Sequence, residues 1–394
     1  MNANRSFWEI DKNGRKRLEG SKMDENRMGK IKEVVKRVRA FVQKIGAFLK
    51  RKDIVFSAKR YGIDALSAMA QGLFASLLIG TILSTLGEQF GIEALMEIGG
   101  YAKGATGYAM AVAIGHALKC PPLVLFSLAA VGGAANALGG AGGPLAVLIV
   151  TIFAAECGKA VSKETKIDIL VTPCVTILVG CLLSIFWAPA IGTAASAVGN
   201  AIMWATELHP FFMGVIVSVI VGIALTLPIS SAAICAALGL TGLAGGAAVA
   251  GCCAQMVGFA VLSFRENRWG GLVAQGLGTS MLQMGNIVKN PRIWIPATLT
   301  SAITGPIATC FFQLKMNGAA VASGMGTCGL VGQIGVYTGW MNDIAVGTKD
   351  RVTSFDWLGL VLICFILPGV LTWLFGLLFR KIGWIKENDL KLDL

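Results

Sequence analysis

The chain has 394 residues, of which 55% are hydrophobic and 14% are charged, whereas ordinary globular domains carry about 25% charged residues. Its formal net charge is +12, and the excess lies in residues 1–60, which hold 18 Lys and Arg against 7 Asp and Glu. Residues 208–264 contain none of these four types. Together these features exclude a soluble domain and indicate a multi-pass membrane protein with its basic end at the cytoplasmic face. Anionic lipid beside the first apolar span accounts for the positive charge, so no nucleic-acid partner is expected.

Two segments precede the apolar body. Residues 1–27 are polar and mixed in charge, which predicts a disordered terminus, and they lack the apolar core of a secretory signal. In 28–60, apolar residues recur at steps of three and four, and lysines and arginines fill most of the other face. This pattern predicts a basic amphipathic helix lying in the headgroup layer of the bilayer. Packing on a partner or on the body of the protein is the alternative.

Residues 61–382 form the predicted transmembrane domain, an all-α fold with about ten crossings. The basic first segment and the pair Arg380-Lys381 after the last span both predict cytoplasmic termini, which requires an even number of crossings. Residues 383–394 are then expected to be a cytoplasmic tail. The ten cysteines lie in apolar surroundings without a C-x-x-C pair, so packing roles are expected and no metal or cofactor is.

Two segments of the body, 269–288 and 317–341, are too rich in glycine to be simple spans. Each glycine lowers helix stability by about 1 kcal/mol relative to alanine. Irregular backbone is tolerated at membrane depth only where it lines a cavity, and paired broken segments are typical of a transport site. The alternative is that the glycines only permit close helix packing, as in Gly242-x-x-x-Gly246.

The densest polar run inside the body lies in 278–291 and offers neutral donors and acceptors, as a sugar would need. Its candidate solute-binding residues are Thr279, Ser280, Gln283, Asn286 and Asn290. A second candidate follows Pro228, where Ser230 and Ser231 begin a helix whose free N–H groups could point at a ligand.

Glu207 and His209 are ionisable residues between two apolar stretches. Burying such residues at membrane depth is costly, so they could face a polar cavity and bind hydroxyl groups. The alternative is a loop at the membrane surface, where both are in water.

Four runs of the sequence, LTLPISSAAICAALGLTGLAGGAAVAGCCAQMVGFAV, SFREN, GLGTSMLQMGNIVKNPRIWIP and GMGTCGLVGQIG, carry a family resemblance. Over roughly residues 60–380 the chain resembles the EIIC-type permeases of the bacterial phosphotransferase system, in the branch that includes perfringolysin-regulator-like proteins. The resemblance implies about ten transmembrane helices with re-entrant hairpins, a homodimer in the bacterial plasma membrane, and sugar entry coupled to phosphorylation. Glu207 and His209 match by type the Glu and His that commonly contact the sugar, but no motif aligns them.

Residues 1–60 contain neither Cys nor His, and they are too few for an EIIB or EIIA domain, which needs about 100 residues. Any phosphate is therefore expected from separate EIIA and EIIB proteins, and no catalytic residue is assigned. The expected function is a carrier for a small polar solute, namely a sugar or a related compound. The alternative is a membrane-embedded regulator or sensor that keeps the fold and signals through its basic head.

Overall fold

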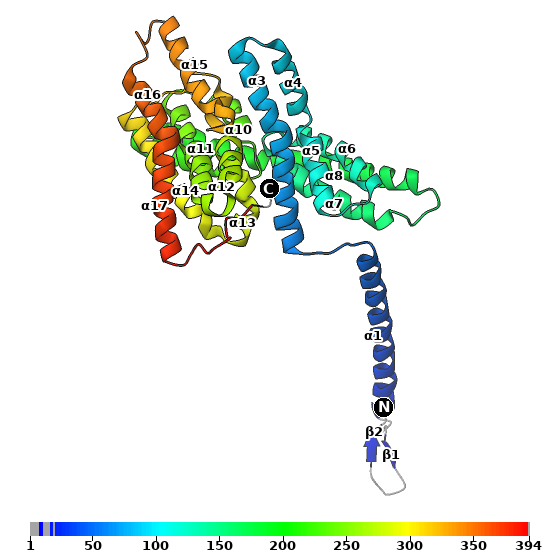
Figure 1. The fold of residues 1–394 in the computed structure, drawn as a ribbon. Helices are drawn as coiled ribbons and strands as arrows, with labels where there is room; N and C mark the ends of the chain where they lie inside the picture. The colour runs from blue at the N-terminus through cyan, green and yellow to red at the C-terminus, as the bar shows by residue number, and fades with distance from the viewer. Residues whose placement is uncertain (1–7, 11–15, 19, 393–394) are drawn as a thin grey trace, which may run out of the picture. The chain divides into compact units, whose positions relative to one another are not determined.

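The computed structural model describes residues 8–10, 16–18 and 20–392. The chain divides into two compact units, Met1–Val55 and Phe56–Leu394. Figure 1 shows that the described part of the second unit consists of helices and their connections. The predicted all-α membrane fold is thus confirmed for the body.

The first unit holds a short hairpin and a long helix. Strands β1 (Trp8–Ile10) and β2 (Lys16–Leu18) pair antiparallel, and α1 (Gly20–Arg51) follows. Both strands and the start of α1 fall in the range predicted to be disordered, of which 1–7, 11–15 and 19 lie outside the described residues. The helix begins before the predicted 28–60 and ends earlier. Its apolar side chains Ile31, Phe41 and Val42 are exposed.

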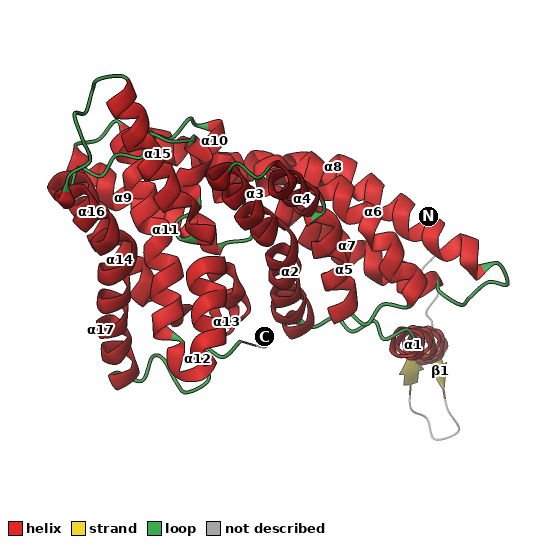
Figure 2. Cartoon of the chain, turned by 45° about the horizontal axis from the view of Figure 1, so that its top comes forward, coloured by secondary structure: helices red, strands yellow, loops and turns green. Residues whose placement is uncertain are grey.

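The body starts with helices that include tight or wide turns, labelled η. Their bounds are η1 (Arg60–Asp64), α2 (Ala65–Leu73), η2 (Phe74–Leu78), α3 (Ile79–Phe90), α4 (Glu93–Gly104), α5 (Thr106–Ala117), α6 (Pro122–Gly139), η3 (Gly140–Gly142), α7 (Gly143–Val161) and α8 (Asp168–Thr206). Helices α5 to α8 pack on one another, and α2 packs on α5. Helix α8 has 39 residues and contains Pro173 and Pro189. In Figures 1 and 2, α6 to α8 run at a steep angle to the last helix, α17.

The second group of helices surrounds α11. Its bounds are α9 (Pro210–Thr226), α10 (Ser231–Ala237), α11 (Gly242–Leu262), α12 (Phe264–Val273), η4 (Ala274–Gly278), η5 (Ser280–Gln283), α13 (Met284–Lys289), η6 (Pro291–Trp294), α14 (Ile295–Pro306), η7 (Ile307–Phe311), η8 (Ala320–Gly324), η9 (Cys328–Leu330), α15 (Val331–Ala345), α16 (Ser354–Val361), η10 (Leu362–Ile366) and α17 (Leu367–Lys381). Helix α11 packs on α9, α14 and α17, and it is buried nearly along its whole length because it is apolar on every side.

Six helical stretches among the described residues are long and apolar enough to cross a membrane, and α9 is a shorter apolar helix. One of the six, 122–161, reverses at Gly140, where φ is +50°, and forms the pair α6 and α7. Several apolar segments are thus broken or short, and the predicted number of about ten crossings remains a prediction.

Both glycine-rich segments form re-entrant hairpins. In the first, 264–290, the helix breaks at Thr279 (φ −158°, ψ 140°) and the chain returns. Its two limbs lie close together: Asn267, before the break, and Gln283, after it, both donate to the carbonyl of Leu390. In the second, 317–341, a Cβ at Gly318 would lie 2.3 Å from the carbonyl oxygen of Gly335, which shows how closely its limbs approach.

The segment after α17, Ile382–Leu392, which we call the tail, is part of the body. The sequence predicts a separate cytoplasmic tail from 383 and a domain that ends at 382. Instead, Ile385 is 3% exposed, Leu390 is fully buried, and both belong to a hydrophobic core that includes α2 residues such as Met69. Burial of these apolar side chains holds the segment in place. The last described residues, Lys391 and Leu392, line a cavity together with residues of α2 and α13.

Candidate functional site

A small cavity lies where the chain is interrupted three times, and we call it the tip cavity. The bend after α9, the break of the first re-entrant hairpin and the turn of the second all line it, together with η2 and α7. Its polar residues are Ser230, Ser231 and Thr279, and its other lining residues are apolar apart from the Cys328 thiol. The volume is about 60 Å³, well below the roughly 300–1,000 Å³ of ligand pockets. The cavity is therefore too small for a solute of that kind and must widen to admit one.

The three hydroxyl groups already have partners that fix the interrupted backbone. Ser231 Oγ donates to the Gly324 carbonyl of the second hairpin at 2.7 Å. Thr279 Oγ1 accepts from its own hairpin, from the Met281 N–H at 3.2 Å. Ser230 Oγ accepts the Ala233 N–H at 3.2 Å and so caps α10. The helix start predicted to offer its N–H groups to a ligand is thus satisfied in part by its own cap.

Behind the tip cavity the hairpin is joined to α9 and α11 by buried polar groups. The hydroxyls of Thr226 and Ser280 lie 2.8 Å apart, and neither residue is exposed. Gln255 Oε1 accepts from Trp294 Nε1 at 2.9 Å and from the Thr226 hydroxyl at 3.4 Å. Ser280 therefore supports the hairpin and does not face a cavity.

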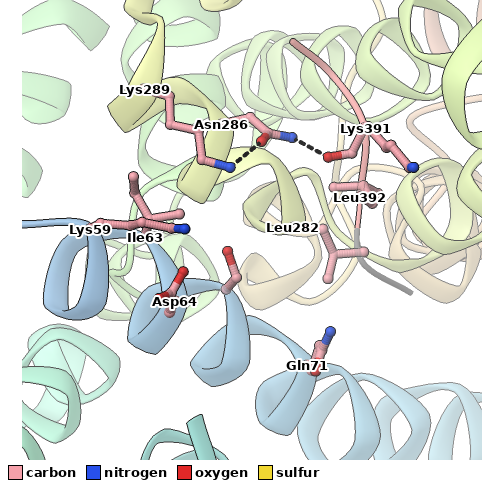
Figure 3. A pocket seen from close by; sticks show the side chains of 10 residues that line it. Lys59, Ile63, Asp64, Gln71, Leu282, Asn286, Lys289, Lys391 and Leu392 are labelled. Atoms are coloured by element: carbon pink, nitrogen blue, oxygen red, sulfur yellow. Dashed lines mark hydrogen bonds between the residues drawn. The ribbon is translucent and has the colours of Figure 1, made fainter. Parts of the chain in front are cut away.

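A larger cavity of about 330 Å³, which we call the lysine cavity, lies further along the same two segments (Figure 3). It is lined by α2 and η1 on one side and by α13 and the tail on the other. Its charged residues are Lys59, Asp64, Lys289 and Lys391, and its neutral polar residues are Ser67, Gln71 and Asn286. Three lysines against one aspartate make this cavity suited to an anion.

The side-chain amides that were predicted to bind a solute are hydrogen-bonded to the backbone of the tail in this structure. Gln283 Nε2 donates to the Leu390 carbonyl at 3.0 Å, and Asn286 Nδ2 donates to the Lys391 carbonyl at 2.8 Å. Asn290 Nδ2 donates to the Trp384 carbonyl at 2.9 Å. Only Asn286 also lines the lysine cavity, where Lys289 Nζ reaches its Oδ1 at 3.4 Å.

Glu207 and His209 lie apart from the other predicted residues. They occupy the connection between α8 and α9, both are exposed, and neither lines the tip cavity or the lysine cavity. This placement corresponds to the surface-loop alternative, because Pro210 begins α9 directly after them.

Sequence reasoning did not single out several residues that form these cavities. Lys59 and Lys391 come from segments predicted to belong to the amphipathic helix and the free tail, so their charge gives no signal of a shared cavity. Gln71 was visible as a polar residue inside the first apolar span, which is the kind of signal that marks a cavity lining.

The arrangement of the two hairpins around the tip cavity defines a class of protein. Two re-entrant hairpins meet at a small cavity lined by neutral hydroxyls and apolar side chains, inside a multi-pass helical membrane protein. No Asp, Glu, His, Lys or Arg lines the tip cavity, so it offers hydrogen-bonding groups without a charge. This is the construction of a membrane carrier.

Comparison with known proteins identifies the family. The family model described as phosphotransferase system, EIIC, matches residues 63–392, and the chain belongs to this family. It is therefore a multi-pass membrane protein of the permease component of that system. No curated protein and no solved structure matches the chain.

Proposed function

We propose that the protein carries a small, uncharged, polar solute of the sugar class across the bacterial plasma membrane. The observation that supports this proposal most directly is the meeting of both hairpin tips at a cavity without charged residues. Hydroxyl groups from Ser230, Ser231 and Thr279 could exchange their present partners for solute hydroxyls when the tips separate. Such an exchange keeps the three hydroxyl groups hydrogen-bonded in both states.

We further propose that phosphorylation, where it occurs, depends on separate EIIA and EIIB proteins. The lysine cavity supports this. It lies along the same two segments as the tip cavity, and its cationic groups would stabilise a phosphoryl group. Its face also carries Arg292 and Arg380, so the positive-inside rule favours a cytoplasmic location for this face and for the tail.

A homodimer is a further proposal. Leu182, Ile185 and Phe186 of α8 are 52%, 55% and 72% exposed. These side chains are suited either to lipid or to the same face of a second copy.

The test is uptake by reconstituted proteoliposomes over a panel of radiolabelled sugars and polyols, with and without purified EIIA and EIIB proteins. We expect saturable uptake of at least one member, with Thr279→Val reducing it and Gly270→Ala, at an uncrowded glycine of the same hairpin, leaving it unchanged. An intact fold with no uptake of any member would reject the carrier proposal. That result would favour a regulatory role for the separate basic unit, Met1–Val55.

A further inference from the structure

Four side-chain amides of the first re-entrant hairpin point toward the tail and donate to its backbone carbonyls. Asn267 Nδ2 and Gln283 Nε2 both donate to the Leu390 carbonyl, at 2.7 and 3.0 Å. Asn286 and Asn290 donate to the carbonyls of Lys391 and Trp384, at 2.8 and 2.9 Å. The amides thus bind main-chain carbonyls near the two ends of the tail.

The side chain of Asn267 pairs with the backbone of the tail as a neighbouring β-strand would. While its Nδ2 donates to the Leu390 carbonyl, its Oδ1 accepts the Leu392 N–H at 2.8 Å. A donor and an acceptor of one amide therefore pair with the backbone groups of alternate residues, as in β-strand addition. This pairing is confined to 390–392, after the turns of 387–390, and it does not involve the side chain at 391.

Apolar and aromatic contacts hold both ends of the tail. Leu390 is fully buried in the same core as Met69 and Leu282. At the start of the tail, the Trp384 ring stacks on Phe379, with centroids 5.1 Å apart and planes 22° apart. The Arg292 guanidinium lies 5.4 Å from the centroid of the Trp384 ring.

The tail lies over the line along which the hairpin meets α2 and η2, and we call this line the seam. The tip cavity and the lysine cavity open at successive points of the seam, between 63–78 and 278–286. Two glycines let the hairpin approach closely here: a Cβ at Gly278 would lie 2.4 Å from the Phe74 ring, and one at Gly285 would lie 2.2 Å from Ser67 Oγ. Figure 3 shows Lys391 and Leu392 across the lysine cavity from α2.

We propose that Asn267, Gln283, Asn286 and Asn290 form a binding site for main-chain carbonyls, that the chain's own residues 384–392 occupy it, and that this docking latches the seam shut. Between the two cavities the hairpin is held by Gln283, whose Nε2 also donates to Gln275 Oε1 at 3.0 Å and whose Oε1 accepts from Asn286 Nδ2 at 2.9 Å. Release of the tail frees the hairpin on the lysine-cavity side and opens the tip cavity to water. The consequence for solute passage rests on the proposed function, whereas the docking and the closure do not.

The experiment uses the natural Cys328 thiol, which lines the tip cavity and is 5% exposed, as the reporter. The full chain in lipid nanodiscs is treated with a polar maleimide, and mass spectrometry follows the modification of each thiol. Asn267→Leu removes two hydrogen bonds to the tail without altering the tail, and a second variant ends after Asp389. Glu387→Gln is the matched control, because that side chain is exposed in the same segment.

We expect both release variants to modify Cys328 about tenfold faster than the unaltered chain and the Glu387→Gln control. Cys253, buried in a separate core with Trp340, should stay unmodified. Hydrogen exchange of 385–392 in Asn267→Leu should accelerate by a similar factor. Unchanged exchange would overturn the amide site, and unchanged Cys328 modification in both variants would overturn the latch. Equal acceleration at Cys253 and Cys328 would also overturn it, because it would show general loosening.

These readouts contain no solute. If they behave as expected but the proteoliposomes take up nothing, the latch stands and the carrier proposal fails. If uptake occurs and Cys328 modification is the same in every variant, the carrier proposal stands and the latch fails.

Discussion

Glu156 and Lys159 form an ion pair inside the helical body, with 2.9 Å between Glu156 Oε2 and Lys159 Nζ. The Lys159 side chain is 1% exposed, and its Nζ also donates to the Leu118 carbonyl at 3.2 Å. Tyr61 donates to the other carboxylate oxygen at 3.0 Å. The pair therefore joins α7 to the start of the first span and to the turn after α5.

We predict that Glu156→Gln lowers the free energy of unfolding by about 3–5 kcal/mol, because it leaves a buried ammonium without its counter-charge. Chemical denaturation in detergent measures the change. The control is Glu33→Gln, which breaks the exposed Arg37–Glu33 pair of α1 and should cost less than about 1 kcal/mol. Equal effects at the two sites would show that burial does not govern the Glu156 pair.

The buried hydroxyls of Thr226 and Ser280 allow a double-mutant test. Thr226→Val or Ser280→Ala alone strands a partner and should destabilise the protein by about 1–3 kcal/mol. The double variant should cost less than the sum, with a coupling of about 0.5–1.5 kcal/mol, because it leaves neither hydroxyl stranded. Strict additivity in the same denaturation experiment would contradict a direct contact.

The close approach of the hairpin to α2 predicts strong position dependence for alanine substitutions. Gly285→Ala would place a Cβ 2.2 Å from Ser67 Oγ and should cost about 1–3 kcal/mol by overpacking. Gly270→Ala has nothing within 4 Å of its Cβ and should be neutral or slightly stabilising. Thermal unfolding of the two variants compares them, and Gly285→Ala combined with Ser67→Ala should recover part of the loss. A loss at Gly285 that Ser67→Ala leaves unrelieved would place the strain elsewhere.

For solute uptake, we predict different outcomes for the two groups of sequence candidates. Glu207→Gln should leave uptake unchanged within about twofold, because the residue is exposed and lines neither cavity. Ser231→Ala should lower uptake about tenfold, since it removes a hydroxyl from the tip cavity. A tenfold loss in Glu207→Gln would move the solute site to the α8–α9 connection.

Local patterns in the sequence were enough to predict the apolar spans, the helix in 28–60 and both broken segments. Each depends on residues that are neighbours in the chain, such as the run Gly278-Thr279-Ser280, where low helix propensity acts locally. The tail is different. Its residues KENDLKLDL have the composition of a solvated end, but Leu390 packs in a core with residues far away in the chain, and its carbonyl accepts from side chains 107 and 123 residues away.

The site could be predicted by residue type but not by partner. Gln283 and Asn286 are buried amides at a hairpin, as expected, yet the sequence cannot show that a backbone carbonyl rather than a sugar hydroxyl satisfies them. For Glu207 and His209, the apolar flanks are the same whether the connection lies at the surface or in a cavity. In the structure both residues are exposed in the connection between α8 and α9 and line neither the tip cavity nor the lysine cavity.

Because helix α8 is much longer than the bilayer is thick, the thickness of the membrane can act on the orientation of this helix. At 1.5 Å per residue its 39 residues extend about 58 Å, whereas the hydrocarbon layer is about 30 Å thick. Exposed apolar side chains occur near both of its ends, at Ile169 and Trp204, so the helix must lean far over to keep them in lipid. A thicker or thinner membrane would therefore apply a torque to α8 and to the helices packed on it, with Pro189 as a point of bending.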